Sequence, residues 1–455
     1  MKLFSKSSDL TTIVTSEGKI TLLSLFVPIF FEIFLKNFMN TANVLILSHL
    51  SDDAVASVGV ATQLLQLVMM LFMVSGIGAT VVISQNLGAG NKKRASEMAI
   101  TAIAIAVIVS VFVGIIGVIF APQLMKLMQL EYKLITDATS FFRIVVGFSI
   151  FSAMITLFSA VARSYGRAKE ALYVSFIMNA LNAFGSYIVI YRPFETPFYG
   201  VTGVAVTRIM SEAITLIVMI ILVRRMKLGL DFKCLYPFPI QQIKSILRIA
   251  VPTGVESFSY SMSQTVTTAM IAVLGAASVS SKIYVQNIVF YVYLIGLALG
   301  QSTSIMIARL IGGGEFERAY RLSFRNLKIV ICSNAFFSLI VIIFRYQLIG
   351  LFTQNEEIIE MAAKIFIIDF LVEIGRGFNH IEQGSLRAAA DVKVPMTVSI
   401  CSSWCCSILF SYILGVRLGF GLIGCWIAFG MEELVRGALL YRRWKSKKWQ
   451  RKVTL

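Results

Sequence analysis

Residues 100–120 read ITAIAIAVIVSVFVGIIGVIF and contain no charged side chain. A helix of about 20 apolar residues is long enough to cross a hydrocarbon core of roughly 30 Å. Similar runs recur along all 455 residues, and the chain is 57% hydrophobic and only 14% charged. Soluble domains carry about a quarter charged residues. The sequence therefore predicts an integral membrane protein, and the continuous apolar runs favour helices over the alternating strands of a barrel.

The spacing of these runs predicts twelve membrane-spanning helices. They fall at residues 18–48, 53–86, 94–120, 134–161, 170–191, 200–223, 245–273, 279–310, 320–344, 358–386, 395–416 and 419–441. The longest polar connection contains Pro237 and Pro239 and divides the chain into similar halves. The predicted organisation is a segment 1–17, a six-helix lobe 18–223, a linker 224–244, a second six-helix lobe 245–441 and a basic tail 442–455.

The net charge of +17 predicts orientation rather than a nucleic-acid partner. When the connections are assigned alternately to two sides, one side takes most of the Lys and Arg, including the tail from Arg442 to Lys452. Basic residues collect on the cytoplasmic side of membrane proteins. Both termini fall on that side, as an even number of spans requires. We expect a multi-pass protein of the plasma (inner) membrane of a bacterium, with the lipid bilayer as its surroundings.

The two halves repeat each other at a constant offset of 224 residues. Parallel halves of six spans are typical of secondary transporters that work by alternating access. The repeat therefore predicts two pseudo-symmetric bundles. Four separate regions agree on the offset: Val27, Pro28 and Glu32 with Val251, Pro252 and Glu256; Gln63 with Asn287; residues 88–90 with 312–314; and Arg163 and Lys169 with Arg387 and Lys393.

Two loops carry a family resemblance. Residues 84–95, SQNLGAGNKKRA, resemble the loop after the second helix of MATE (multidrug and toxic compound extrusion) transporters. Residues 386–395, LRAAADVKVP, resemble that family's loop between helices ten and eleven, where glycine usually stands in place of Ala388 and Ala390. The resemblance implies an all-α, V-shaped pair of six-helix bundles. It also implies a monomeric cation-coupled antiporter, not an enzyme, which uses Na⁺ or H⁺ and no cofactor to export amphipathic, often cationic small molecules.

The expected coupling residues of that family are only partly present. Members that couple protons in the first lobe often carry an aspartate where this chain has Asn40. In helix five Asn182 matches the family, but Ser186 replaces an aspartate. In helix seven Tyr260 stands where sodium-coupled members often have glutamate, and in helix ten Arg376 stands near an expected acid. The resemblance therefore leaves the first lobe without its acids.

Charged residues inside predicted spans point to function, because charge at membrane depth is costly. Asp369, Glu373 and Arg376 share one face of helix ten with His380 and Gln383. We hypothesise a coupling site of Glu256, Glu373 and Asp369 with Arg376 as countercharge. Glu256 and Glu373 would either bind Na⁺ or titrate. The alternative is static ion pairing, of Glu373 with Arg376 and of Glu32 with Lys36, and for Glu32 we favour that pairing.

The substrate cavity should have a polar lining. A competing function within the same superfamily is a lipid-linked sugar flippase, for which Lys36, Arg143 and Arg376 would supply a cationic groove. A non-transporting scaffold is disfavoured by the intramembrane acids. The predicted lining residues are Asn40, Asn182, Glu32, Lys36, Tyr260, Gln264 and Asn379.

Overall fold

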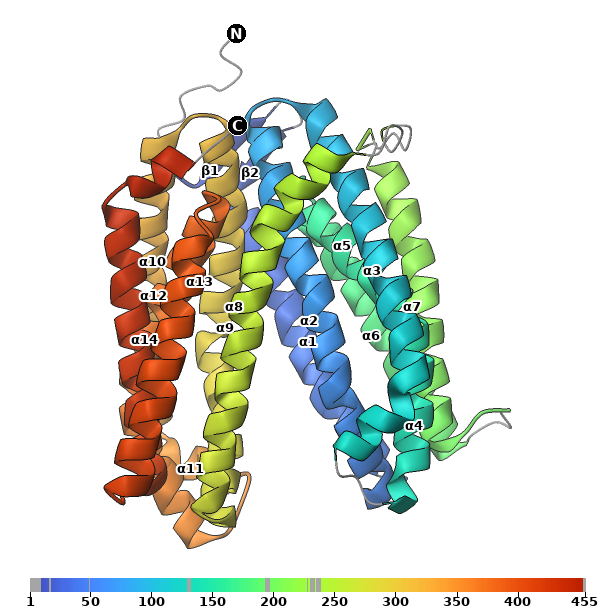
Figure 1. Ribbon diagram of the computed structural model, residues 1–455, viewed down its shortest axis with the longest axis vertical. Coiled ribbons are helices and arrows are strands. Elements are labelled where there is room, and N and C mark those ends of the chain that lie inside the picture. Colours follow the sequence, from blue (N-terminus) through green and yellow to red (C-terminus); the bar gives the residue numbers. More distant parts are fainter. Residues whose placement is uncertain are drawn as a thin grey trace. The chain divides into compact units, whose positions relative to one another are not determined.

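A computed structural model describes residues 10–15, 18–48, 50–128, 132–192, 197–226, 228–229, 234 and 239–452. The chain is built almost entirely of helices (Figure 1). In order they are α1 (Leu22–Ser48), α2 (Asp52–Gly88), α3 (Lys92–Leu127), α4 (Tyr132–Gly147), α5 (Ser149–Ser164), α6 (Ala168–Tyr191), α7 (Gly200–Arg225), α8 (Ile240–Val273), α9 (Ala276–Gly312), α10 (Phe316–Ile343), α11 (Arg345–Gly350), α12 (Glu356–Ala388), α13 (Lys393–Ser402), the π-helical segments η2 (Ser403–Ile408) and η3 (Ser411–Arg417), α14 (Gly421–Lys445) and the 3₁₀ helix η4 (Lys448–Lys452).

A short hairpin precedes the first helix. Strand β1 (Thr12–Thr15) pairs antiparallel with β2 (Gly18–Thr21), so the first helix begins at Leu22 and not at residue 18 as the sequence predicts. Thr21 Oγ1 accepts a hydrogen bond from the Ser24 backbone N–H at 3.1 Å, and Ser24 Oγ accepts one from the Thr21 N–H at 3.1 Å. This reciprocal pair satisfies backbone donors that a helix start leaves open, which is why the helix begins there.

Twelve spans are accounted for, but three of them are unusually polar. Over the described residues, eight helices are long and apolar enough to cross a membrane, and α4 with α5, bent by 48°, forms a ninth span. The long helices α8, α12 and α14 complete the set. These three helices carry the charged residues of the C-lobe described below, which explains why apolarity alone misses them.

Two compact units divide the chain. We call Val27–Leu87 with Asn91–Ala250 the N-lobe. The C-lobe contains Val251–Leu455, Gly88–Gly90 and the described residues up to Phe26. The hairpin belongs to the C-lobe because Arg318 Nη2 donates to the Thr12 carbonyl at 2.8 Å. The sequence predicts a separate segment 1–17, a first lobe from residue 18 and a second lobe from residue 245, so it assigns β2 to the first lobe. A contact between residues 306 positions apart leaves no local pattern in the sequence.

The 224-residue repeat recurs in the helix bounds. Shifting α2 by 224 gives α9, and shifting the start of α3 gives the start of α10. The single helix α12 spans the same stretch as α4 and α5 together, which break at Phe148. After α2 and α9, Gly90 and Gly314 have φ of 76° and 77°, a left-handed conformation that favours glycine. The halves therefore repeat in backbone geometry as well as in sequence.

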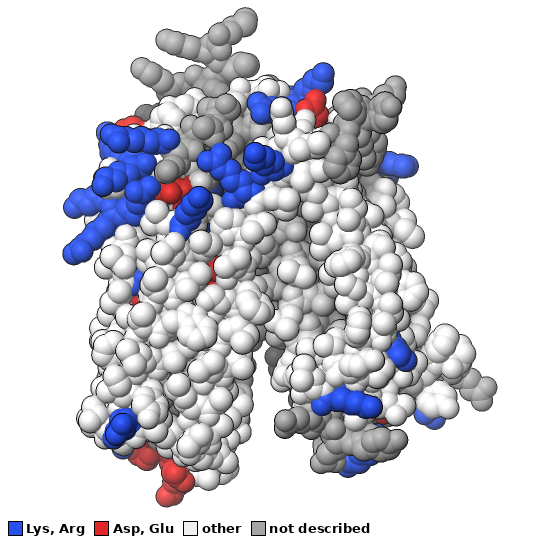
Figure 2. Space-filling view, viewed as in Figure 1, with Lys and Arg blue, Asp and Glu red and all other residues white. Residues whose placement is uncertain are grey.

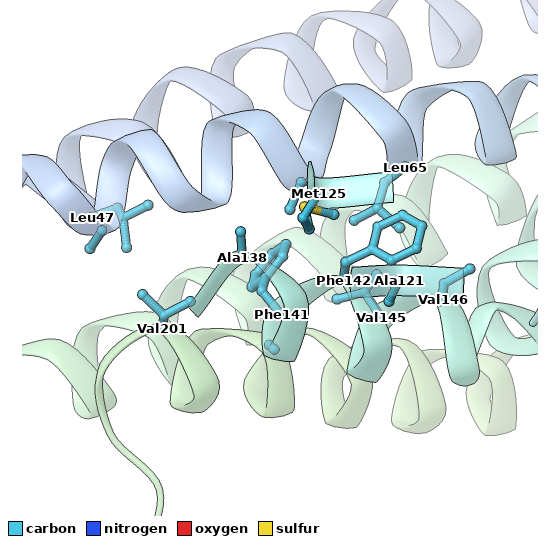
Figure 3. Packing of buried hydrophobic residues seen from close by; sticks show 13 residues of the cluster. Leu47, Leu65, Ala121, Met125, Ala138, Phe141, Phe142, Val145, Val146 and Val201 are labelled. Carbon is cyan, nitrogen blue, oxygen red and sulfur yellow. The ribbon is translucent and has the colours of Figure 1, made fainter. Parts of the chain in front are cut away.

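Each lobe has its own apolar core. In the N-lobe, Phe142 and Val146 of α4 pack near Met125 of α3 and Leu65 of α2 (Figure 3). The C-lobe core includes Phe366 of α12 and Trp426 of α14. The lateral surfaces also carry many exposed large apolar side chains, as expected for helices that face lipid.

Candidate functional site

Acids and bases alternate inside the C-lobe between α12 and α14. Arg376 pairs with Glu373 one turn before it, and its Nε lies 4.0 Å from Glu433 Oε1. Arg436 donates to Glu433 Oε2 at 2.6 Å and lies 2.9 Å from Glu432 Oε1. The three glutamates are at most 3% exposed. We call these five residues the α12–α14 network.

Neighbouring side chains hold the network acids in place. Asn334 of α10 donates to the Glu373 backbone carbonyl at 3.0 Å and to its Oε2 at 3.3 Å. Asn379 donates to both the backbone carbonyl and the carboxylate of Glu433. One turn before Glu373, Asp369 accepts a hydrogen bond from Trp426 Nε1 at 2.9 Å. Donors from three helices therefore fix the carboxylates, as a buried charge requires.

Carboxylates outnumber guanidinium groups at this site. Asp369, Glu373, Glu432 and Glu433 contribute four acids, against the two bases Arg376 and Arg436. Each arginine also lies over a tyrosine ring, with Arg376 Cζ at 4.4 Å from the Tyr293 centroid and Arg436 Cζ at 5.3 Å from that of Tyr260. The two tyrosine rings stabilise the positive charges of these guanidinium groups. With four ionised acids the cluster has an excess of two negative charges, which favours uptake of cations into a low-dielectric interior.

Close approach of α12 and α14 depends on Gly375. A Cβ at this position would lie 2.7 Å from the Glu433 carbonyl carbon and 2.8 Å from the Leu434 nitrogen. Small residues of this kind let membrane helices pack backbone to backbone. The network distances therefore depend on a residue that carries no charge.

We expect Gly375→Ala to push the two helices apart and to lower the free energy of unfolding by about 1–3 kcal/mol. The thermal unfolding midpoint of the purified protein measures this. Gly430→Ala is the matched control on α14, because its Cβ would meet only Val372 Cγ2 at an ordinary 3.6 Å. Equal midpoints for the two variants would contradict the packing argument.

The structure brings together five of the predicted site residues. Glu373 and Arg376 belong to the network, Asn379 and Tyr260 contact it, and Asp369 lies one turn before Glu373 on α12. The acids and arginine of α14 were missed. They stand at positions 432, 433 and 436 inside the predicted span 419–441, so the rule that flags charges at membrane depth applies to them too.

Glu256 lies elsewhere, in an ion pair with Arg387. Arg387 Nη2 donates to Glu256 Oε2 at 2.8 Å, and Gln383 donates to the other carboxylate oxygen. Gln383 is ten residues beyond Glu373 on α12, about 15 Å along the helix. Glu256 and Glu373 therefore do not converge on one sodium ion, because their partners lie on different turns of α12.

The same ion pair occurs in the N-lobe. Arg163 Nη1 donates to both carboxylate oxygens of Glu32, at 2.8 and 2.9 Å. Both partners stand 224 residues before Glu256 and Arg387. The predicted pairing of Glu32 with Lys36 is thus replaced by a pairing with another helix, which helical spacing alone does not reveal.

The other predicted lining residues are spread over both lobes. Asn182 on α6 and Gln264 on α8 are half-buried, and Lys36 on α1 is exposed. Tyr260 lies under Arg436, as described. Asn40 lies in α1, but its side chain is outside the described residues. Within the described parts of the chain, no three His, Cys, Asp or Glu side chains form a group suited to a metal ion.

The N-lobe has a smaller charged pair that the sequence reasoning also missed. Arg208 Nε lies 3.3 Å from Glu212 Oε1, and Ser152 Oγ donates to Glu212 Oε2 at 2.5 Å. The repeat relates Arg208 and Glu212 to Glu432 and Arg436, so acid and base exchange places between the halves. At these positions the two lobes therefore have the same helices but opposite charges.

Twelve spans in two repeated halves, with charge held at membrane depth, define a secondary transporter. The MatE family model matches residues 28–188 and again residues 252–413, so the two matches begin 224 residues apart. The chain belongs to the MatE family, whose members are transporters and not enzymes. The resemblance drawn from the two loops and the twelve-helix, two-lobe prediction are both confirmed.

Known relatives agree with this assignment. The uncharacterized transporter YisQ of Bacillus subtilis is 39% identical over 433 residues, 95% of each chain. The probable multidrug resistance protein NorM of Thermotoga maritima is 24% identical over 439 residues, covering 95% of this chain and 94% of NorM. A crystal structure of MATE in the straight conformation superposes with a TM-score of 0.87 at 18% identity, covering 94% of this chain and 95% of the other.

Proposed function

We propose that the protein is a cation-coupled antiporter, driven by Na⁺ or H⁺, that exports amphipathic and mainly cationic small molecules. The observation that carries this proposal is the excess of two acids over bases in the C-lobe cluster of Asp369 and the α12–α14 network. The relatives named multidrug resistance proteins support the substrate class. The coupling ion is the only cofactor-like component that the proposal needs.

The coupling acids in this proposal are Asp369, Glu373 and Glu433. Arg376 lies between Glu373 and Glu433, so a cation that neutralises Glu373 leaves the guanidinium to Glu433 alone. The pairing of α12 with α14 then differs between the loaded and unloaded states. A ligand that interacts unequally with two states shifts their populations, which is what coupling requires. Glu256, held by Arg387, serves in this proposal as a structural ion pair.

Orientation and membrane follow from the distribution of charge. Figure 2 shows Lys and Arg side chains gathered at one end of the C-lobe, over the ends of α10 and α14, and acidic side chains at the opposite end. By the positive-inside rule we propose that the basic end is cytoplasmic, together with both termini. We propose a monomer in the plasma membrane of a bacterium, since the relatives are bacterial and related MATE structures are single-chain transporters.

Everted membrane vesicles test the export proposal directly. We expect a Na⁺ or pH gradient to drive uptake of a cationic dye. Glu373→Gln should reduce that uptake about tenfold or more, because the variant has no carboxylate at position 373 for the coupling cation to neutralise. Glu317→Gln is the control, since Glu317 makes exposed pairs with Arg321 and Lys447. The proposal is wrong if no dye moves in response to either gradient with the unaltered protein.

A lipid-linked sugar flippase is a second candidate, favoured by the charges of the N-lobe. Lys36, Arg163 and Arg208 outnumber Glu32 and Glu212 there, and the charges interact with one another. A surplus of bases suits an anionic headgroup. Gradient-independent movement of a fluorescent polyprenyl-diphosphate sugar across proteoliposomes, together with failure of dye export, would favour the flippase.

A further inference from the structure

A cluster of polar side chains around one buried acid, Glu382, lies in the C-lobe, apart from the α12–α14 network. Glu382 of α12 is 0% exposed. Ser323 Oγ of α10 lies 3.4 Å from its Oε2, a long hydrogen bond, and Ser323 and Ser385 share a hydrogen bond of 2.9 Å. Glu382 Oε1 has no hydrogen-bond partner among the described residues. One of the two oxygens of this buried carboxyl therefore has no hydrogen-bond donor among the described residues.

A second buried acceptor faces the same helix junction. Asn326 stands three residues after Ser323, on the same face of α10. Its Nδ2 donates to Thr303 Oγ1 of α9 at 2.7 Å, but its Oδ1 has no partner within the described chain. Burying acceptors without donors is costly, so these two oxygens, on helices α10 and α12 that pack against each other and against α9, favour a cation or a proton on the carboxyl.

Charged groups of the surrounding helices do not supply that charge. On α10 the side chains of Arg321, Arg325 and Lys328 are exposed, on the face away from the buried Ser323. On α12, Arg387 is taken by Glu256, and on α14, Arg436 is taken by Glu432 and Glu433. Further titratable groups on these helices are Arg309 of α9, His380 of α12 and Tyr441 of α14, whose ring contacts Phe324 and Phe378. No ion pair joins Glu382 to any residue that the structure describes.

The repeat shows that packing alone does not require these polar side chains. The equivalent positions in the N-lobe, 224 residues earlier, are all apolar and all buried. At these positions α2, α3 and α5 therefore carry no hydroxyl, amide or carboxyl. The equivalents of Glu382, Ser323, Ser385, Asn326 and Thr303 are Phe158, Ala99, Val161, Ala102 and Ala79.

We propose that Glu382 is a separate cation site, which takes up one monovalent cation, H⁺ or Na⁺. As a carboxylic acid Glu382 supplies the hydrogen-bond donor that the cluster lacks. As a carboxylate it offers, with the hydroxyls of Ser323 and Ser385, the oxygen ligands that hard cations take. Glu382 stands six residues before the end of α12, about 9 Å along the helix. This proposal goes beyond the export function, because Glu382 would bind H⁺ or Na⁺ at equilibrium whether or not an exported molecule is present.

Thermal unfolding of the purified full chain tests the site, since a ligand that binds only the folded state raises the midpoint. Two series are compared: choline replaced by about 100 mM Na⁺ at constant ionic strength near pH 8, and acidification to about pH 6 in choline. We expect Na⁺ or acid to raise the midpoint by about 2–4 °C. Glu382→Gln should lose part of that response, and Glu373→Gln should lose a different part.

The outcomes separate the two ions. Loss of only the acid response in Glu382→Gln identifies a proton, and loss of the Na⁺ response identifies sodium. A Glu382→Gln variant whose responses to both match the unaltered protein overturns the proposal. If that variant does not fold, Ser323→Ala, which removes the one described donor to Glu382, should shift the half-effective Na⁺ concentration or pH severalfold, and no shift overturns it. Dye export enters neither measurement, so the export proposal can fail independently.

Discussion

Arg376→Gln is expected to be the most damaging single substitution at the candidate site. The change leaves Glu373 without its ion-pair partner and removes one of the two charges facing Glu433. Removing one partner of a buried ion pair costs about 3–5 kcal/mol, because the remaining charge stays buried and unpaired. We therefore expect a large fall in the yield of folded protein and in its unfolding midpoint, and no gradient-driven dye export from the remainder.

The double variant Glu373→Gln with Arg376→Gln distinguishes an unpaired charge from a lost contact. Removing both charges leaves two neutral amides that can hydrogen-bond to each other, so we expect the double variant to be more stable than Arg376→Gln alone. Size-exclusion profiles and unfolding midpoints in detergent give the comparison. A double variant less stable than either single variant would show that the pair is not the main energetic link.

The duplicated ion pair gives the second large effect. Glu256→Gln and Glu32→Gln each leave an arginine, 16% and 17% exposed, without its carboxylate. We expect both to lower the free energy of unfolding by similar amounts, up to about 3 kcal/mol. We also expect both variants to keep the dependence of transport on the ion gradient. The same ion pair stands in the N-lobe, which has no α12–α14 network, so the pair itself points to a structural role.

The comparison of these two variants also tests the role predicted for Glu256 from the sequence. If Glu256 is a coupling acid, Glu256→Gln loses gradient dependence while Glu32→Gln keeps it. Dye uptake into everted vesicles is measured with each gradient, at matched amounts of folded protein. Equal retention of gradient dependence supports a structural role for both pairs and leaves the network as the coupling site.

Sequence patterns were sufficient to predict the membrane spans and the internal repeat. Apolar runs predicted the spans, and the offset of 224, taken from landmark residues, also holds for the bounds of α2 and α9. Helical spacing correctly grouped Glu373 with Arg376 on one face of α12. These features are local or periodic, so one sequence contains all the information that they need.

Partners between helices were not predictable in the same way. The repeat aligned Glu32 with Glu256 and Arg163 with Arg387, yet nothing in the spacing says that each glutamate meets its arginine across two helices. The network side chains on α14 were not predicted. The polar face of α12 implies that a polar helix packs against it, but the sequence does not say which helix that is. Glu382 was not predicted because it does not follow the three- and four-residue spacing of the polar face, which includes the adjacent Gln383.

The hydrogen bond from Trp426 to Asp369 has a spectroscopic consequence. All four tryptophans, Trp404, Trp426, Trp444 and Trp449, lie in the C-lobe. Indole emission excited selectively therefore originates in that lobe alone, and the N-lobe contributes no background. Because Trp426 Nε1 donates to a carboxylate beside the network, 2.9 Å away, its emission is sensitive to the charge on that acid. If Asp369 takes part in ion coupling as proposed, the emission of Trp426 should report ion occupancy without a dye or attached label.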